Sequence, residues 1–432
     1  MFRRIASACI AIAALVCVVA ARQPESRVFD QIDSIVKSLS DITDLPEKHT
    51  VPYSRISKRD LRRFLTKRIK KTLKPQEIYA DELALKMFGL VPQTFDLRKS
   101  TIDLLTEQAA AFYDYDKKKL FLLEGTSFEA ETTTLAHELS HALADQHFDL
   151  GKFMQDAPAN DDENLAHTAV VEGQASWLML AYDLKQAGQP PVPTAEMLSS
   201  VADSSEESMT EYPVLKNSPL YIQQSLLFPY TQGILFFDAV YKRLGKGAFA
   251  AVFKDPPSDS AEVIHPERYF AHNRASKPAL PTFTLKEHLH ELTEGSVGEF
   301  DHEMLLQQYI NEAKSAGLAR HVRGGQFKIA EAGKNETPLL EYVSEWESED
   351  HARTFFECYQ QILAKKWKRC DVLTRGNTVF AGEGDTGYFF VQLKGAIVMS
   401  IEGLSDREDW ERLRPVPERV SAALHCCVEF HP

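Results

Sequence analysis

The segment His137–His141, of sequence HELSH, constrains this 432-residue chain more than any other feature. Residues i and i+4 lie on the same face of an α-helix, so His137 and His141 can bind one metal ion together. Glu138, next to the first imidazole, is placed to accept a proton from a water molecule that the metal activates. The segment therefore predicts a helix that carries a Zn²⁺-dependent hydrolytic site.

The residues around this motif favour the same interpretation. No Gly or Pro occurs between residues 126 and 150, and apolar residues recur at helical spacing, namely Leu135, Leu139, Ala142 and Leu143. Residues 110–124 are predicted to form two strands with a turn between them. A strand beside a histidine helix can hold an extended peptide through main-chain hydrogen bonds, as a peptidase requires. The alternative is a core helix whose two histidines are hydrogen-bonded and bind no metal.

Zinc hydrolase sites usually have three protein ligands and one open position, and His147 is the first candidate for the third ligand. It has the spacing of the HExxHxxGxxH pattern, but Ala144 stands where that pattern has its Gly. Ala continues a helix, and in a continuous helix His147 points roughly 80° away from His137. We therefore expect His147 to miss the metal.

Glu172 is the second candidate. It lies in a predicted helix over residues 162–185, and small residues follow it: Gly173, Ala175 and Ser176. Such residues allow this helix to pack closely on the histidine helix, which would bring the Glu172 carboxylate to the metal. Glu163 and His167 on the same helix remain alternatives for the third ligand.

The HELSH segment followed by a later helix that carries VEGQA (residues 171–175) resembles the gluzincin metallopeptidases. The stretch from Thr134 to Leu150, with parts of residues 228–233 and 256–266, is similar to poorly characterised bacterial exported metallopeptidases, so the resemblance spans about residues 61–270. It implies a mainly helical α+β fold with a zincin-like catalytic domain, in which His137, His141 and Glu172 bind Zn²⁺. Ser176 departs from the thermolysin-like pattern, which has an Asp there to orient a ligand. Asp145 or His147 would then take that role.

The expected reaction is hydrolysis of a peptide or protein by water. Glu138 would accept the proton of the attacking water and pass it to the leaving amine. A further donor normally stabilises the oxyanion, and the candidates are His265 and Tyr230. No motif spacing places either residue at the metal.

The first residues have the pattern of a secretory signal. Arg3 and Arg4 precede an apolar run from Ile5 to Val19, and small residues follow. The run is short for a membrane-spanning helix, so we expect residues 1–21 to be a cleaved signal peptide and the protein to be exported, secreted or periplasmic. An uncleaved N-terminal anchor is the alternative and the only membrane contact expected. The basic amphipathic helix predicted over residues 57–74 is expected to pack its apolar side on the domain.

Net charge bears on the possible partners of the protein, and cysteine content bears on its possible disulfides. The net charge of −13 argues against nucleic acid. Beyond the signal, the cysteines are Cys358, Cys370, Cys426 and Cys427. Export permits disulfides between them, and the sequence alone does not choose a pairing.

The predicted organisation has four parts. A helical region over residues 22–98 follows the signal, the zincin-like catalytic domain takes residues 99–322, and a small α+β module takes residues 323–432. A mobile loop is expected over about residues 186–219 because Pro, Ser and Glu are frequent there, and it is a candidate lid. Residues 285–316 are expected to be mainly helical.

The sequence thus predicts an exported zinc metallopeptidase. One alternative is a catalytically inactive zincin-fold protein that acts as a binding or scaffold protein of the cell envelope. A zinc hydrolase that cleaves a non-peptide amide is the other. Glu138 argues against the first, because a purely structural zinc site needs no general base.

Overall fold

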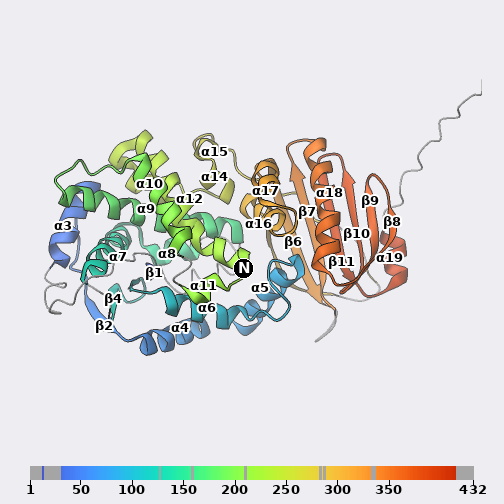
Figure 1. The fold of residues 1–432 in the computed structure, drawn as a ribbon, viewed down its shortest axis with the longest axis horizontal. Coiled ribbons are helices and arrows are strands. Elements are labelled where there is room, and N and C mark those ends of the chain that lie inside the picture. Colours follow the sequence, from blue (N-terminus) through green and yellow to red (C-terminus); the bar gives the residue numbers. More distant parts are fainter. Residues whose placement is uncertain are drawn as a thin grey trace, which may run out of the picture.

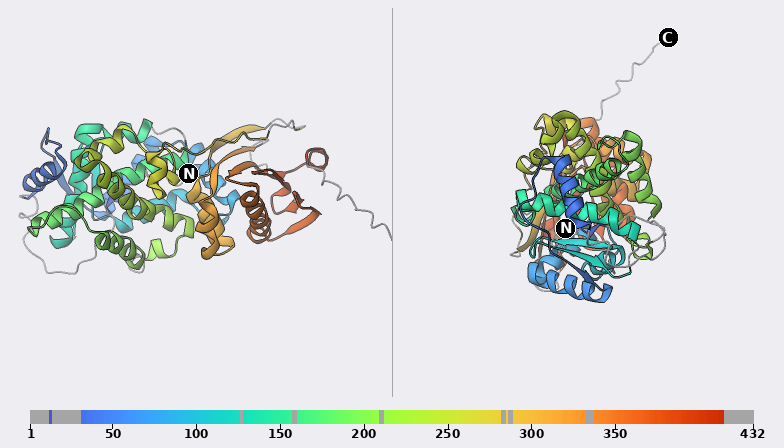
Figure 2. Two further views of the ribbon diagram at one scale, coloured as in Figure 1. Left: turned by 90° about the horizontal axis from the view of Figure 1, so that it is seen from above. Right: turned by 90° about the vertical axis from the view of Figure 1, so that its left-hand side faces the viewer.

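Two β-sheets at opposite ends of an otherwise helical chain organise the fold. The computed structural model describes residues 12–13, 31–125, 128–156, 160–208, 212–281, 285, 289–331 and 337–414. Figures 1 and 2 show a helical part (residues 31–281) and a sheet part (residues 289–414) arranged end to end along the long axis of the molecule. The fold is α+β and mainly helical, as the sequence predicts.

The N-terminal sheet lies beside the predicted site and has the strand order β1-β3-β4-β2 among the described residues. The hairpin predicted over residues 110–124 is present as β3 (Ala111–Asp114) and β4 (Lys119–Leu123). β2 (Tyr53–Ile56) pairs in parallel with β4, so the predicted N-terminal helical region also contributes a strand. β1 (Ile12–Ala13) pairs antiparallel with the other edge of β3, and the rest of the predicted signal lies outside the described residues.

The described residues of the N-terminal region are mainly helical, with α3 (Ile32–Thr43), α4 (Lys58–Thr72), α5 (Pro75–Phe88) and α6 (Leu97–Gln108). Of these, α4 packs on the sheet, where the Phe64 ring stacks on that of Phe112 in β3 with centroids 5.4 Å apart. Ser57 caps α4, because its hydroxyl accepts a hydrogen bond from the Asp60 N–H. Leu61, Leu65 and Ile69 of α4 are fully buried at a spacing of four residues. The basic amphipathic helix therefore packs its apolar side on the domain, as predicted.

The motif helix α7 (Phe128–Phe148) and α9 (Asp161–Gln186) follow the hairpin, with the short α8 (Leu150–Asp156) between them. α12 (Leu220–Leu244) then packs along α9. A Cβ atom on Gly173 would lie 2.2 Å from the Gly233 backbone, and one on Gly233 would lie 2.4 Å from the Ala169 carbonyl oxygen. The small residue after Glu172 thus permits close approach to α12 rather than to α7.

We expect Gly173→Ala and Gly233→Ala each to destabilise the protein by about 1–3 kcal/mol, because the added methyl meets backbone atoms that cannot turn aside. Chemical denaturation of the purified variants measures this loss. Gly317→Ala is the matched control, since Gly317 is also helical and a Cβ there would meet nothing within 4 Å. That change should be neutral or slightly stabilising. Equal stability of all three variants would contradict the proposed contact between α9 and α12.

Two stretches differ from the sequence-based prediction. The segment expected to be a mobile loop contains α10 (Ala195–Ser208) and α11 (Pro213–Lys216), so the lid interpretation loses its basis. Residues 285–316, expected to be mainly helical, include β5 (His290–Ser296) before α16 (Glu299–Tyr309) and α17 (Glu312–Ala319). The short helices α13 (Ala248–Lys254), α14 (Ser260–Ile264) and α15 (Pro266–Phe270) lead towards the sheet part.

The C-terminal sheet is antiparallel, in the order β5-β6-β7-β11-β10-β9-β8. Its remaining strands are β6 (Val322–Glu331), β7 (Leu339–Trp346), β8 (Cys370–Arg375), β9 (Val379–Gly384), β10 (Gly387–Lys394) and β11 (Ile397–Leu404). The sheet therefore includes β5, which precedes the boundary predicted at residue 323.

Helices cover both faces of this sheet. Phe389 belongs to the core that α18 (Glu349–Lys366) completes, whereas Phe390 clusters with Trp410 of α19 (Arg407–Leu413). Successive residues of a strand point to opposite faces, so the two helices lie on opposite sides of β10. After β11 the structure describes α19, and residues from 415 onward lie outside the described part.

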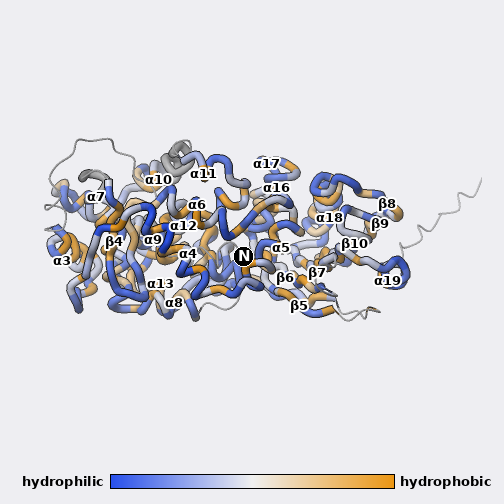
Figure 3. Tube along the Cα trace, turned by 90° about the horizontal axis from the view of Figure 1, so that it is seen from below, coloured by the Kyte–Doolittle hydropathy of each residue, from blue (hydrophilic) through white to orange (hydrophobic). Residues whose placement is uncertain are grey.

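The structure also describes two of the cysteines and the apolarity of the helices. Cys358 and Cys370 are both free thiols in the structure, and Cys426 and Cys427 lie outside the described residues. Polar and apolar stretches alternate along the chain (Figure 3), and within the described ranges no helix combines the length and apolarity that a membrane crossing needs.

Candidate metal centre

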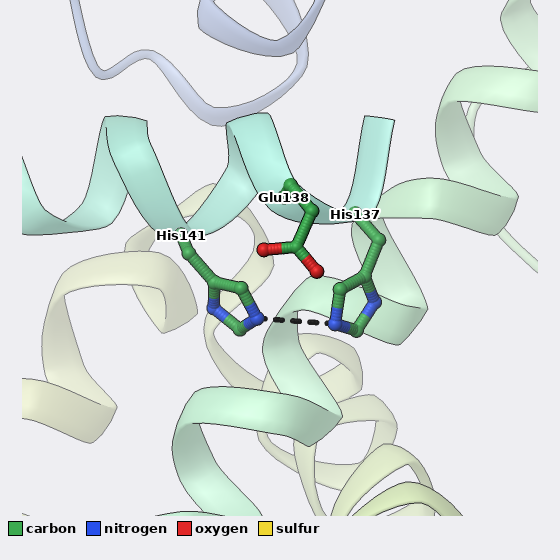
Figure 4. Close-up of side chains that lie close together, drawn as sticks. All are labelled: His137, Glu138 and His141. Atoms are coloured by element: carbon green, nitrogen blue, oxygen red, sulfur yellow. Dashed lines mark hydrogen bonds between the residues drawn. The ribbon is translucent and has the colours of Figure 1, made fainter. Parts of the chain in front are cut away.

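Helix α7 presents the motif residues from one side, as the spacing of four residues predicts. The side chains of His137, Glu138 and His141 extend from the same side of α7, with the carboxylate between the two rings (Figure 4). The two Nε2 atoms lie 3.0 Å apart, and the two histidines are 3% and 1% exposed. Two imidazole nitrogens are thus held close together away from bulk water.

Glu172 completes this arrangement from the neighbouring helix α9. Its Oε2 atom lies 3.1 Å from His137 Nε2 and 3.4 Å from His141 Nε2. Donor atoms about 2.1 Å from a tetrahedral zinc ion are separated by about 3.4 Å. The three donor atoms therefore fit one zinc ion, and they are the His₂Glu set predicted from the sequence.

The electrostatics of Glu172 favour a cation at this point. Burial alone would raise the pKa of this carboxyl, but the adjacent His141 and His137 lower the pKa to about 2. Burial lowers the pKa of His137, whereas Glu172 raises the pKa of His141 despite burial. A buried negative charge facing imidazole nitrogens is stabilised by a bound positive ion.

Glu138 is the candidate proton acceptor. It is fully buried, and one of its carboxylate oxygens lies within 4.8 Å of a ring nitrogen of both His137 and His141. Glu172 Oε2 is the donor atom predicted from the sequence as the third ligand, and Glu138 lies beside the histidines with its carboxylate directed between the rings (Figure 4). Its role as proton acceptor stays a prediction.

Tyr230 is a further polar side chain that the fold brings to the group. It comes from α12, and its ring centroid lies 6.2 Å from that of His137. Burial, the charges of Glu172 and Glu138 and a hydrogen bond to Glu172 raise the pKa of Tyr230 well above its usual value. The phenol therefore keeps its proton and can donate a hydrogen bond.

His265, the other predicted oxyanion donor, lies elsewhere. Its Nε2 atom is 2.8 Å from Glu299 Oε1 of α16. Both residues line a separate cavity of about 410 Å³, whose wall on α12 includes Phe228 and Thr231 but not Tyr230. Of the two candidates, the structure thus brings Tyr230 alone to the histidine pair.

The remaining candidate ligands have other partners. His147 Nε2 lies 2.8 Å from the Pro46 carbonyl oxygen, so this imidazole ties the end of α7 to the segment after α3. His167 stacks on Phe153 with ring centroids 4.6 Å apart, and burial lowers its pKa to about 4. Burial raises the pKa of Glu163, whose positively charged neighbours are Lys277 and Arg274.

Asp145 joins the hairpin to α7. Its carboxylate accepts hydrogen bonds from the Tyr113 hydroxyl at 2.9 Å and from Lys118 Nζ at 2.8 Å. It also contributes to raising the pKa of His141. Asp145 thus lies close to the pair, as expected of a residue that orients a ligand, although it accepts its hydrogen bonds from the hairpin and from the Leu150 N–H.

Sequence reasoning missed Tyr115. Its ring lies edge-on to His141, with centroids 6.5 Å apart, and it follows directly after β3. Its position within the predicted strand segment beside the histidine helix could have indicated that it lies near the site.

No protein family model, curated protein or solved structure matches this chain. The resemblance to the gluzincins therefore rests on the motif residues themselves.

Proposed function

We propose that this protein is a zinc-dependent hydrolase that acts as a peptidase, with Zn²⁺ bound by His137, His141 and Glu172. The observation that carries the proposal is the meeting of a carboxylate oxygen and two imidazole nitrogens from separate helices, at separations that suit one ion. A bound zinc would lower the pKa of a water molecule and polarise the substrate carbonyl.

The chain's own residues supply the remaining parts of the reaction. Glu138 accepts a proton from the attacking water and delivers it to the leaving amine. Tyr230, kept protonated by its surroundings, exchanges its hydrogen bond to Glu172 for one to the oxygen of the scissile carbonyl as negative charge develops there. Burial of the group excludes bulk water and strengthens both interactions.

Peptide as the substrate is supported by the outer edge of β3. Ile12 and Ala13 pair there antiparallel with Phe112 and Ala111, so this edge accepts an extended segment by strand addition. β3 packs against α7, which carries the histidine pair. In this proposal the protein is exported and residues 1–21 are removed as a signal peptide, which leaves the β3 edge open to a substrate.

The scaffold alternative predicts the same metal without turnover, and Glu138 argues against it. A zinc hydrolase that cleaves a non-peptide amide would use the same residues but would not need the edge of β3.

Metal analysis tests the metal assignment. We expect His137→Ala and Glu172→Ala each to lose about one equivalent of zinc per chain relative to the unmodified protein, because each removes a ligand. His147→Ala is the matched control: its imidazole bonds the Pro46 carbonyl oxygen, so zinc content should be unchanged. Elemental analysis after gel filtration measures both. Full zinc retention in Glu172→Ala would remove Glu172 from the ligand set.

A further inference from the structure

A second group of metal-binding side chains lies in the sheet part. His321 precedes β6, Glu347 follows β7, and His351 lies in the first turn of α18. Each offers one ligand atom, and these atoms lie within 4.8 Å of one another. None of these residues belongs to the centre formed by α7 and α9. The three are partly or largely exposed, so an ion can reach them from solvent.

The group contains a shielded imidazole nitrogen that makes no hydrogen bond to the described residues. His321 Nδ1 lies 2.7 Å from Glu347 Oε2. The rings of His321 and His351 stack almost parallel, at 11°, with centroids 3.8 Å apart. His351 Nδ1 is shielded from solvent and has no hydrogen-bond partner among the described residues. A shielded nitrogen without a partner is costly unless a ligand uses it.

Glu347 is oriented from the helical part of the molecule. Arg268 of α15 places a guanidinium nitrogen 3.3 Å from Glu347 Oε1 and donates to the Arg320 carbonyl oxygen at 2.8 Å. One carboxylate oxygen thus faces Arg268, while the other faces the imidazoles. The carboxylate is therefore held in place, with Oε2 directed at the histidine pair.

We propose that His321, Glu347 and His351 form a second binding site for a divalent transition-metal ion such as Zn²⁺. Two imidazoles and one carboxylate are the donor set that such ions prefer, whereas Mg²⁺ and Ca²⁺ prefer oxygen donors alone. The site has three protein ligands and lies at the surface, so water or an external ligand completes the coordination.

Loading this site requires a small rearrangement. An imidazole lone pair lies in the ring plane, so two stacked parallel rings cannot both point at one ion between them. His321 is fixed by Glu347, so His351 is the ring that turns. The ion would take the place of the hydrogen bond that now joins His321 Nδ1 to Glu347 Oε2.

A bound ion would connect three elements that are separate in the sequence. It would join the start of β6 and the end of β7 to the start of α18, next to the contact that Arg268 makes from α15. An ion that binds the folded state alone stabilises it. The site would therefore make the thermal stability of the sheet part dependent on metal.

Zinc titration of the full-length chain tests this proposal. After treatment with chelator, we expect His137→Ala, which lacks the α7 centre, to bind about one equivalent of Zn²⁺ and to unfold at a higher temperature with zinc than without it. Adding His321→Ala or His351→Gln should abolish both effects. The exposed His272, 3.9 Å from Asp255, provides the matched control, and His272→Ala should change neither.

The unmodified protein offers a second readout if His137→Ala folds poorly. It should bind two equivalents of zinc, and His351→Gln should bind one while keeping its hydrolytic activity. Equal zinc binding by His351→Gln and the unmodified protein would overturn the second site. That result would leave the α7 centre untouched, because loss of zinc in His137→Ala is a separate measurement.

Discussion

Replacement of Glu138 by Gln is expected to leave zinc bound and to reduce hydrolysis by a factor on the order of 10³, because the amide keeps the shape of the side chain but cannot accept a proton. Glu138 is fully buried, lies between the two imidazoles, and is not one of the three donors in the proposed ligand set, so zinc binding should not depend on it. The measurement pairs zinc content with initial rates on internally quenched peptides of mixed sequence.

Asp149→Asn controls for the loss of a carboxylate near the same helix, since Asp149 is exposed and lies 3.4 Å from Lys118 Nζ. This variant should retain full activity. If Glu138→Gln left the rate unchanged, Glu138 would not be the general base. If the unmodified protein held zinc and cleaved no peptide, the scaffold alternative would gain support.

Lys366→Met should cost about 3–5 kcal/mol of the free energy of unfolding, because it leaves a buried carboxylate without its positive partner. Lys366 Nζ lies 2.6 Å from Glu402 Oε2, and the two side chains are 2% and 1% exposed. The ammonium also donates to the Met87 carbonyl oxygen at 2.8 Å, so it joins α18 to both β11 and α5. Urea denaturation of the purified variants measures the loss.

Two further variants serve as a control and as a test of rescue for this measurement. Lys368→Met changes an exposed lysine close by and should stay within about 0.5 kcal/mol of the unmodified protein. Lys366→Met combined with Glu402→Gln should recover part of the loss, because the amide is neutral and its oxygen still accepts from the Tyr359 hydroxyl. A single Lys366→Met variant of unchanged stability would show that the pair contributes nothing net.

The candidate centre can be predicted from the sequence to the extent that it depends on local geometry. The spacing of His137 and His141 sets their common face, and Glu138 follows from its place beside the first ligand. Glu172 lies 35 residues away from His137, so its approach depends on how α9 packs, and the resemblance is what indicates it. Periodicity cannot reveal that Gly173 faces α12, and it therefore cannot choose Tyr230 over His265.

The fold predictions failed for segments whose secondary structure depends on contacts with a neighbouring element. β5 has the sequence HELTEGS and largely lacks the apolar alternation of a strand, yet it pairs with β6 along its length. α10 is rich in Ser and Glu, which resembles a loop, but Leu198 and Val201 place an apolar edge against the core. β7 and β11 lie inside the sheet, paired on both sides, and they belong to the α+β module predicted over residues 323–432.

The place of β5 also bears on any attempt to divide this protein. The chain enters the C-terminal sheet at β5, leaves it for α16 and α17, and returns at β6. A fragment starting at residue 323 would expose the backbone of β6 where β5 now covers it, and bare strand edges invite self-association. Recombinant work on either half should therefore cut the chain before residue 289, since a cut at the boundary suggested by composition would separate a strand from its own sheet.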